Sequence, residues 1–515
     1  MKKNKFILLI VILILFNLNI NGKILKYAEV SRPQYFAPYL SDDILTLRIL
    51  DLIYAPMFRI FNVETAGDIT TPVKKVFANE YNTSPYRTTV TLKNNIKWSD
   101  NHRRELTSKD IEFTFNLINS DYINTSYKYI TSIISKIKTM SKKSLSVDYK
   151  VYTKYKLSVL DFPIVSYRTY LSPKNYFKKV EKGDLNFNGP YILEKTFKRD
   201  SIYFKRNVNY PDPPEIDGVK ISISPSYENI EKGVISGLYE LITDVPPEKA
   251  YRNFKGDKRF NIYPSFENKF YYISLNYNKN IEFKNKNFRR ALIYGINREG
   301  ILDSVYLGGG KVISGPFNPT FFGYDNQIIP YEYDQKKAIE YLKDVKFKKK
   351  FIFIQPQGNK ELDNVVFSIQ QNLKKINIIL DVKKYSWSEY LNKLKNGEYD
   401  MAIVEYSSAK TLTSISPLLL PDGYLNFGKY NSKEQNEKLY NLIKEVEGPS
   451  SFELDPIVIT TKYKNIHKIL HEEIPYIWLF TLQKSLVISK IYDFDFIVPS
   501  RPFMNIDEWR VINEN

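Results

Sequence analysis

Strands and helices alternate between residues 351 and 404, and this alternation most limits the folds open to the chain. Apolar runs at 351–354, 378–382 and 401–404 are predicted as strands. The segment 362–373 has apolar residues at helical spacing, and 387–394 is predicted as a second helix. A strand–helix–strand order favours a mostly parallel sheet with helices on both faces. We therefore expect an α/β protein of two lobes, with a cleft between them, in this chain of 515 residues.

Shorter signals place further elements before and within this pattern. Thr107 and Asp110 have the spacing of a capping box and predict a helix that begins there. Residues 189–206 are predicted as a hairpin, and the apolar spacing from Phe288 to Ile296 predicts a helix. No segment after residue 22 is apolar enough to cross a membrane.

The N-terminus is predicted to be a signal peptide over residues 1–22. Lys2, Lys3 and Lys5 precede an apolar run over 6–16, which is too short to span a bilayer. The chain has no cysteine, so lipid attachment through a cysteine is excluded, together with disulfides and thiolate chemistry. We expect a periplasmic or extracellular protein that is not lipidated; an uncleaved N-terminal anchor is the alternative.

The net charge of +18 raises the question of a nucleic-acid partner. Basic residues are not clustered, since the longest run is Lys348–Lys350 and acidic residues are interleaved throughout. Loss of three lysines with the signal peptide lowers the charge to +15. Abundant Ile, Lys, Asn and Tyr fit an A/T-rich coding sequence, so we expect no nucleic-acid partner.

Motifs for catalysis or metal binding are weak. His467 and His471, followed by two glutamates, could share a helix face, but the pattern of zinc proteases is missing. Residues 308–311, Gly-Gly-Gly-Lys, lack the hydroxyl residue of a phosphate loop. No nucleophile motif is found. We expect no enzyme activity, no metal and no cofactor; a secreted hydrolase is kept as an alternative.

Aromatic residues make up 15% of the chain, with 41 tyrosines. They concentrate at 271–272, 385–390, 399–406 and 476–480. Aromatic rings with polar tips can line a ligand pocket. Many of these tyrosines could equally fill core positions.

Five ordered blocks together resemble the family 5 extracellular solute-binding proteins, the oligopeptide, dipeptide and nickel receptors of ABC importers. The blocks are Trp98-Ser99-Asp100 with 106–115, Gly189-Pro190-Tyr191 with Arg206-Asn207 and Tyr210, 288–292 with 296–298, Tyr333-Asp334 with Ala338 and Leu342, and 397–401. The resemblance covers essentially the whole mature chain.

The resemblance implies a bilobed periplasmic binding protein fold of class II type with an inserted subdomain. Lobe I would comprise 23–43, 171–268 and 484–515, the inserted subdomain 44–170, and lobe II 269–483. Two strands near Phe270 and Leu482 would form the hinge, and lobe closure would enclose the ligand.

The resemblance also implies the function and the site. The protein would capture peptides and deliver them to an inner-membrane ABC permease complex, as a monomer. By position, Trp387 and Tyr406 would be aromatic walls of the cleft; Tyr406 stands where many members have Trp. The expected lining further includes Tyr271, Tyr272 and Asn276, with Trp478 a weaker candidate.

The sequence departs from the family pattern at one position that is usually charged. Peptide-binding members usually present an Asp for the peptide's α-ammonium, but the string here is 407–411, Ser-Ser-Ala-Lys-Thr, with Ala409 at the Asp position. A buried ammonium without a counter-charge is costly. Ala409 and Lys410 therefore motivate an alternative, an anionic or metal-chelate solute. A surface protein for nucleic acid or anionic envelope polymer is a further alternative.

Overall fold

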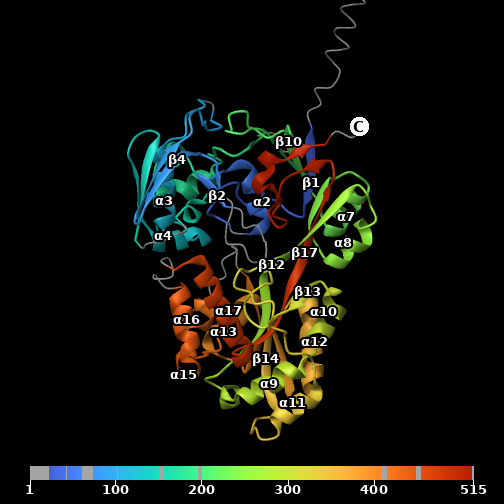
Figure 1. Cartoon of the computed structure of the whole chain (residues 1–515). Coiled ribbons are helices and arrows are strands. Elements are labelled where there is room, and N and C mark those ends of the chain that lie inside the picture. Colours follow the sequence, from blue (N-terminus) through green and yellow to red (C-terminus); the bar gives the residue numbers. More distant parts are fainter. Residues whose placement is uncertain are drawn as a thin grey trace, which may run out of the picture.

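Two long strands connect the lobes of the computed structural model, which describes residues 23–41, 43–60, 73–100, 102–150, 156–194, 200–407, 415–447 and 454–512 (Figure 1). The strands are β12 (Phe260–Leu275) and β17 (Ile477–Ser489), paired antiparallel. We call the described residues 269–483 lobe II and the remaining described residues lobe I. The predicted signal peptide lies outside the described residues.

The hydrophobic cores change along these strands. Leu486 and Ile488 of β17 are buried in a cluster with Leu25, whereas Leu482 belongs to the cluster of lobe II. The pairing register of β12 with β17 also shifts between Phe266 and Phe270. The chain therefore passes from one core to the other within a few residues. A third, smaller cluster lies around α7 (Tyr227–Ile235) and α8 (Pro247–Phe254).

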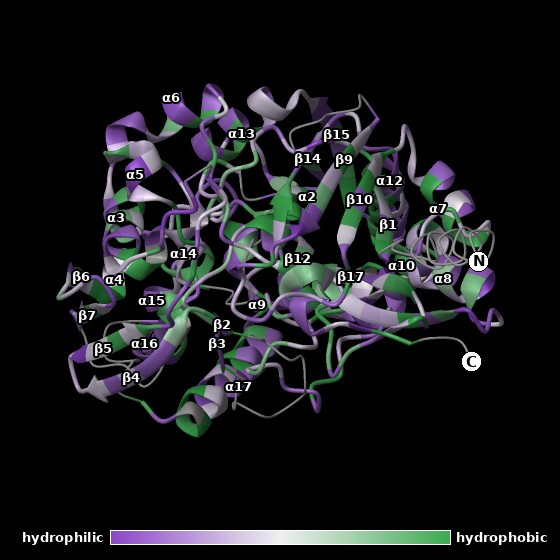
Figure 2. Ribbon diagram, turned by 90° about the horizontal axis from the view of Figure 1, so that it is seen from above, coloured by the Kyte–Doolittle hydropathy of each residue, from purple (hydrophilic) through white to green (hydrophobic). Residues whose placement is uncertain are grey.

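Lobe I is built on a four-stranded sheet in the order β1-β10-β9-β8. Its strands are β1 (Ile24–Glu29), β8 (Tyr191–Leu193), β9 (Ser201–Arg206) and β10 (Gly218–Ile223). β8 and β9 pair antiparallel, as the predicted hairpin requires, and β1 runs parallel to β10. In Figure 2 the strands β1 and β10 are largely hydrophobic, and the outer helices α5 (Tyr167–Tyr170) and α6 (Tyr176–Glu181) largely hydrophilic.

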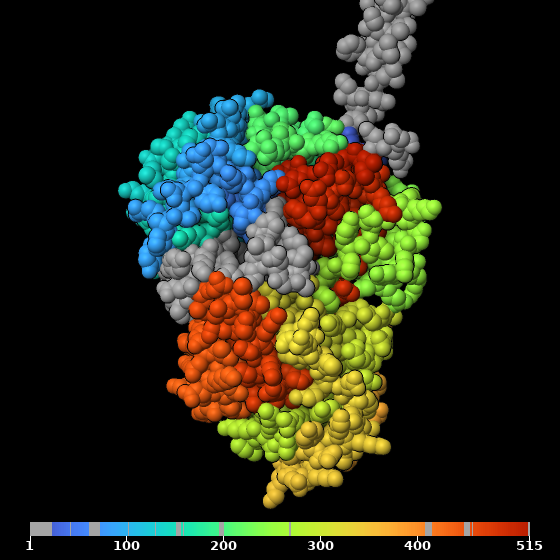
Figure 3. Space-filling view, in the orientation of Figure 1, coloured from blue at the N-terminus to red at the C-terminus, as the bar shows by residue number. Residues whose placement is uncertain are grey.

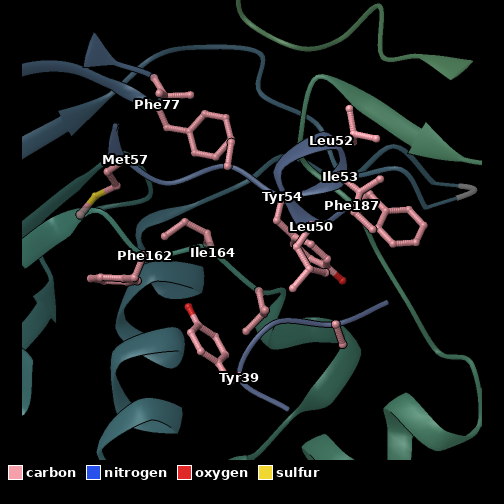
Figure 4. Packing of buried hydrophobic residues seen from close by; sticks show 14 of the residues in the cluster. Tyr39, Leu50, Leu52, Ile53, Tyr54, Met57, Phe77, Phe162, Ile164 and Phe187 are labelled. Carbon is pink, nitrogen blue, oxygen red and sulfur yellow. The ribbon is translucent and has the colours of Figure 1, made fainter. Parts of the chain in front are cut away.

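A second sheet of lobe I is antiparallel, in the order β4-β5-β7-β6. The predicted capping box is present at α3 (Ser108–Asn119), where the Thr107 N–H donates to Asp110 Oδ2 over 2.8 Å. Helix α2 (Ile44–Ile53) packs Leu50 and Ile53 into the core (Figure 4). The elements of this region are β4 (Ala78–Ser84), β5 (Arg87–Leu92), β6 (Ile134–Thr139), β7 (Ser144–Tyr149), β2 (Phe58–Ile60), β3 (Val73–Lys75) and α4 (Ile130–Ile133).

One continuous core joins the 44–170 region to the rest of lobe I. Phe77 and Phe162, shown in Figure 4, lie in a buried cluster. The same cluster contains Tyr27, Phe503 and Trp509. Tyr27 and Phe503 pack edge to face with ring centroids 5.4 Å apart. The C-terminal segment thus completes the core that the N-terminal strand begins. Its elements are β18 (Tyr492–Asp493) and β19 (Arg510–Val511).

Lobe II contains the predicted alternation. β14 (Lys350–Pro356) runs parallel to β15 (Ile379–Tyr385) and to β16 (Met401–Ser407), with α12 (Lys360–Lys374) and α13 (Trp387–Asn396) between them. The remaining elements are α9 (Lys286–Gly295), α10 (Arg298–Tyr306), β13 (Gly310–Val312), α11 (Gln335–Leu342), α14 (Ser416–Leu419), α15 (Ser432–Gln435), α16 (Glu437–Glu447) and α17 (Pro456–Glu473).

The full sheet is mixed, which corrects the expectation of a mostly parallel one. Seven described strands form it, in the order β11-β17-β12-β16-β14-β15 with β13 beside β17. β12 is antiparallel to both β16 and β17, and β11 (Leu241–Val245) is antiparallel to β17. β12 carries the chain from lobe I into lobe II, and β17 carries it back. The two strands therefore run in opposite directions. The α/β class and the bilobed architecture are confirmed, and Figure 3 shows the two lobes one above the other.

Candidate functional site

The strands β14, β15 and β16 end at one edge of the lobe II sheet. Each is followed by a helix, and ligands of α/β sheets bind outside the carboxyl ends of the strands. Ser407 at the end of β16 pairs with Lys269, and Lys269 lies where β12 enters lobe II from lobe I. This edge, which we call the carboxyl edge, therefore faces lobe I.

Trp387 is the first residue of α13 and lies at the carboxyl edge, directly after β15. The Ser386 hydroxyl caps the helix by accepting from the Glu389 N–H. Trp387 is 61% exposed and its ring centroid is 5.7 Å from that of Tyr390. A large aromatic surface facing solvent at this edge is available for contact with a ligand.

Tyr406 lies near the end of β16, where its ring stacks on Phe270 of β12 with centroids 4.9 Å apart. Burial, together with the nearby Tyr424 and Glu447, raises the pKa of Tyr406 to about 12. Tyr424 is 77% exposed. Tyr406 is thus partly buried beside polar groups, and a second tyrosine lies close by.

Tyr271 and Tyr272 point to opposite faces of the sheet, because successive side chains of a strand alternate. Tyr271 donates from its hydroxyl to Glu405 Oε2 over 2.5 Å. Tyr272 is buried against Tyr476 and Trp478, with centroids 5.1 and 5.9 Å away. The neighbouring tyrosines therefore have different surroundings.

Trp478 is a core residue of lobe II. It is 1% exposed, and its indole N–H has no hydrogen-bond partner among the described residues. Its ring packs against Tyr476 and Phe270. Trp478 and Tyr272 can therefore reach a ligand only if the structure around them opens.

Asn276 follows the last residue of β12, at the end of the sheet opposite the carboxyl edge. Its amide donates to the backbone oxygens of Gly397 and Tyr399, both over 2.9 Å. The Asn276 amide thus holds the loop after β12, and we do not expect it to contact a ligand. Ala409, the other predicted site residue, lies outside the described residues.

Three polar residues near the site were missed by the sequence interpretation: Glu405, Tyr424 and Glu447. Glu447 accepts from the N–H groups of Ile415 and Ser416 over 2.6 and 2.8 Å, so it holds the start of α14. Glu405 is exposed next to Tyr406. The sequence signal for Glu405 was its place directly before the predicted aromatic wall.

The two histidines that were considered as metal ligands have other contacts. His467 Nδ1 accepts from the Asp325 N–H over 3.0 Å, and the His471 ring stacks on Tyr331 at 4.3 Å. Burial lowers the pKa of His467 to about 4. No group of three or more potential metal-binding side chains occurs in the part of the chain that the structure describes.

The glycine run at 308–310 is a tight turn between α10 and β13. Gly308 has a φ of +73°, and a Cβ on Gly310 would lie 2.5 Å from the Thr481 carbonyl oxygen. Glycine is required by this close approach to β17, which gives the motif a structural reason.

Residues 73–421 match the sequence model of the bacterial extracellular solute-binding proteins, family 5. The chain belongs to this family. It is therefore a solute-binding protein of the kind that serves ABC importers. Within the described residues, no helix has the length and hydrophobicity to span a bilayer.

Relatives of this family 5 protein extend over most of the chain. The dipeptide-binding protein of Escherichia coli K12 is 25% identical over 424 residues, 76% of this chain and 77% of its own. The oligopeptide-binding protein AppA of Bacillus subtilis 168 is 25% identical over 462 residues, 82% and 80% of the two chains. The structure of a putative peptide binding protein AppA from Clostridium difficile has a TM-score of 0.79 at 20% identity, covering 95% of this chain and 100% of its own.

Proposed function

We propose that this protein captures peptides between its lobes and delivers them to an inner-membrane ABC permease. The observation that carries the proposal is the exposed aromatic surface of Trp387 at the carboxyl edge, which faces lobe I. The names of the relatives, a dipeptide- and an oligopeptide-binding protein, support a peptide as the ligand.

Lobe closure about β12 and β17 would enclose the peptide. The ion pairs found between described residues each join two residues of the same lobe, as Arg48–Asp244 does in lobe I and Lys286–Glu473 in lobe II. Closure would leave these pairs intact. The register shift between Phe266 and Phe270 supplies a place where the strands can bend.

Glu405 is the residue that we propose for the peptide's α-ammonium. It supplies a carboxylate at the carboxyl edge, two residues before the string that lacks the usual Asp. Tyr271 donates to one of its oxygens, and the exposed carboxylate retains lone pairs for an ammonium group. Trp387 and Tyr406 would contact the peptide as aromatic walls.

We place the protein outside the cytoplasmic membrane and without a lipid, as the predicted signal peptide and the absence of cysteine indicate. It binds without chemistry in this proposal. Export is tested by fractionation of cells that express the full chain, with mass spectrometry of the mature N-terminus; a cytoplasmic protein beginning at Met1 would contradict it.

Ligand identity is tested by native mass spectrometry of protein purified from expressing cells. Bound peptides, released on denaturation, are the expected result. Small-angle scattering should then show a smaller radius of gyration with peptide than without. A protein that never carries peptide, under conditions in which a relative does, would remove the peptide assignment.

The second candidate is a non-peptide solute of anionic or metal-chelate type, motivated by Ala409 and Lys410. Ala409→Asp separates the two candidates. If the wild-type ligand is not a peptide, the substitution should create peptide affinity; if Glu405 already serves the ammonium, peptide affinity should change little.

A further inference from the structure

A basic depression lies on lobe II, away from the carboxyl edge. It has a volume of about 710 Å³, and its walls are the loop at 277–284, after β12, and residues 346–348, before β14. It adjoins the start of α9, which lies toward the end of lobe II remote from lobe I (Figures 1 and 3). The length of β16, about 20 Å for seven residues, separates it from the carboxyl edge.

Asp400 holds two of the four lysines that line this depression. It is 2% exposed and accepts from Lys279 Nζ over 3.1 Å and from Lys348 Nζ over 2.9 Å. The Ile352 N–H and the Asn280 amide also donate to it, over 2.7 and 3.2 Å. Burial alone would raise the pKa of Asp400, but these hydrogen bonds hold it below its ordinary value.

The charged Asp400 therefore ties the two walls together. Because one carboxylate is shared by two ammonium groups, both are held in fixed positions. Lys279 and Lys348 keep 41% and 40% of their side chains exposed, and each ammonium has three N–H donors, so donors remain for a ligand.

The other two lysines increase the positive charge. Lys284 and Lys346 are exposed, and their ammonium groups make no ion pair or hydrogen bond with any described residue. Glu282, the acidic residue of the lining, is buried, and its carboxylate accepts from the Lys348 backbone N–H over 3.4 Å. Four lysines against Asp400 and Glu282 leave an excess of two positive charges.

We propose that this depression binds a small solute that carries two or more adjacent phosphate groups. Lysine ammonium groups bind phosphate as compact point charges, and fixed ammoniums lose little freedom on binding. The concave shape and the volume are in the range of small-molecule pockets, about 300 to 1,000 Å³. The site is separate from the proposed peptide site, so occupation of one does not require the other.

Calorimetric titration of the full mature protein with inorganic tripolyphosphate tests this proposal. Wild type should bind the probe. Lys284→Gln with Lys346→Gln should weaken binding by at least about tenfold, because two of the four ammonium groups are lost. Lys374→Gln with Lys438→Gln removes the same charge from exposed lysines outside the depression, and this control should stay within about twofold of wild type.

Two further measurements distinguish a free phosphate compound from a lipid headgroup, and failure of this proposal from failure of the peptide proposal. The pocket variant should bind peptide as wild type does. Sedimentation with phosphatidylglycerol vesicles should show no more binding than with neutral vesicles. Absence of tripolyphosphate binding, equal losses in both double variants, or binding to anionic vesicles without binding to the free probe would each overturn the proposal.

Discussion

The Tyr271 hydroxyl donates to Glu405 Oε2 over 2.5 Å across the antiparallel pair of β12 and β16. Tyr271 is 4% exposed, whereas Glu405 is exposed. A buried donor thus orients a carboxylate that remains open to solvent. Hydrogen bonds of this kind, from a hydroxyl to a charged oxygen, are among the stronger ones in proteins.

Glu405→Gln should weaken binding of a peptide with a free α-ammonium by about tenfold, since it removes a charge-assisted contact. Binding of the same peptide with an acetylated N-terminus should change much less. Calorimetry of both peptides measures the difference. Glu398→Gln, at an exposed glutamate before β16, is the matched control, and equal effects of the two substitutions would exclude the proposed role of Glu405.

Trp387→Ala should reduce peptide affinity with little change in melting temperature, because the exposed side chain adds little to the core. Trp478→Ala is the contrasting variant. Its side chain is fully buried, and truncation should lower the free energy of unfolding by about 3 to 5 kcal/mol. Denaturant unfolding and peptide titration of both variants test the assignment; a large stability loss in Trp387→Ala with unchanged affinity would make Trp387 a structural residue.

The backbone at residues 267 and 268 should exchange its amide hydrogens faster than residues 271–275. Phe266 pairs with Gln483 and Phe270 pairs with Thr481. Three residues of β12 but one residue of β17 lie between these two pairs, so regular pairing is interrupted. Peptide binding should slow this exchange if the lobes close about these strands. Hydrogen exchange with mass spectrometry gives both rates, and uniform protection along β12 would contradict a hinge at this place.

Acidification should destabilise the protein through His467. Its pKa is lowered by burial from 6.5 to about 4, so the unfolded chain binds a proton at pH values where the folded protein does not. The contribution to stability is fully present above pH 6.5 and is lost as the pH falls from about 6.5 to about 4. The loss is on the order of 3 kcal/mol over this range.

His467→Asn should reduce this pH dependence, since Asn does not titrate and its oxygen can accept from the Asp325 N–H. Urea unfolding at pH 7 and pH 5 measures the effect. His102→Asn, at an exposed histidine, should behave as wild type. An unchanged pH dependence in His467→Asn would show that other groups carry the acid sensitivity.

The fold was predictable where local patterns are strong. Helical spacing in α12 and the capping box at Thr107 have their causes within a few residues, so the sequence reveals them. The direction of β12 was not predictable in this way. Its pairing with both β16 and β17 depends on contacts far apart along the chain, which periodicity does not encode.

The site was predictable in part, because residue type does not determine exposure. Trp387 and Trp478 are both tryptophans in aromatic-rich segments, yet one is exposed and the other buried. Asn276 is polar, but its amide is used by backbone oxygens. Glu405 gains its interest only from Tyr271 on the neighbouring strand. The division into lobes at 269–483 and the inserted subdomain at 44–170 stay predictions.

The contact between Tyr27 and Phe503 has a consequence for the order in which the two lobes can fold. Residues 270–482, which form the core of lobe II, are contiguous and can pack without the last residues of the chain. Lobe I cannot complete its core until Leu486 to Trp509 are also in place, because these residues pack beside Leu25 and Tyr27. The N-terminal strand therefore stays incompletely covered until the C-terminal segment reaches it.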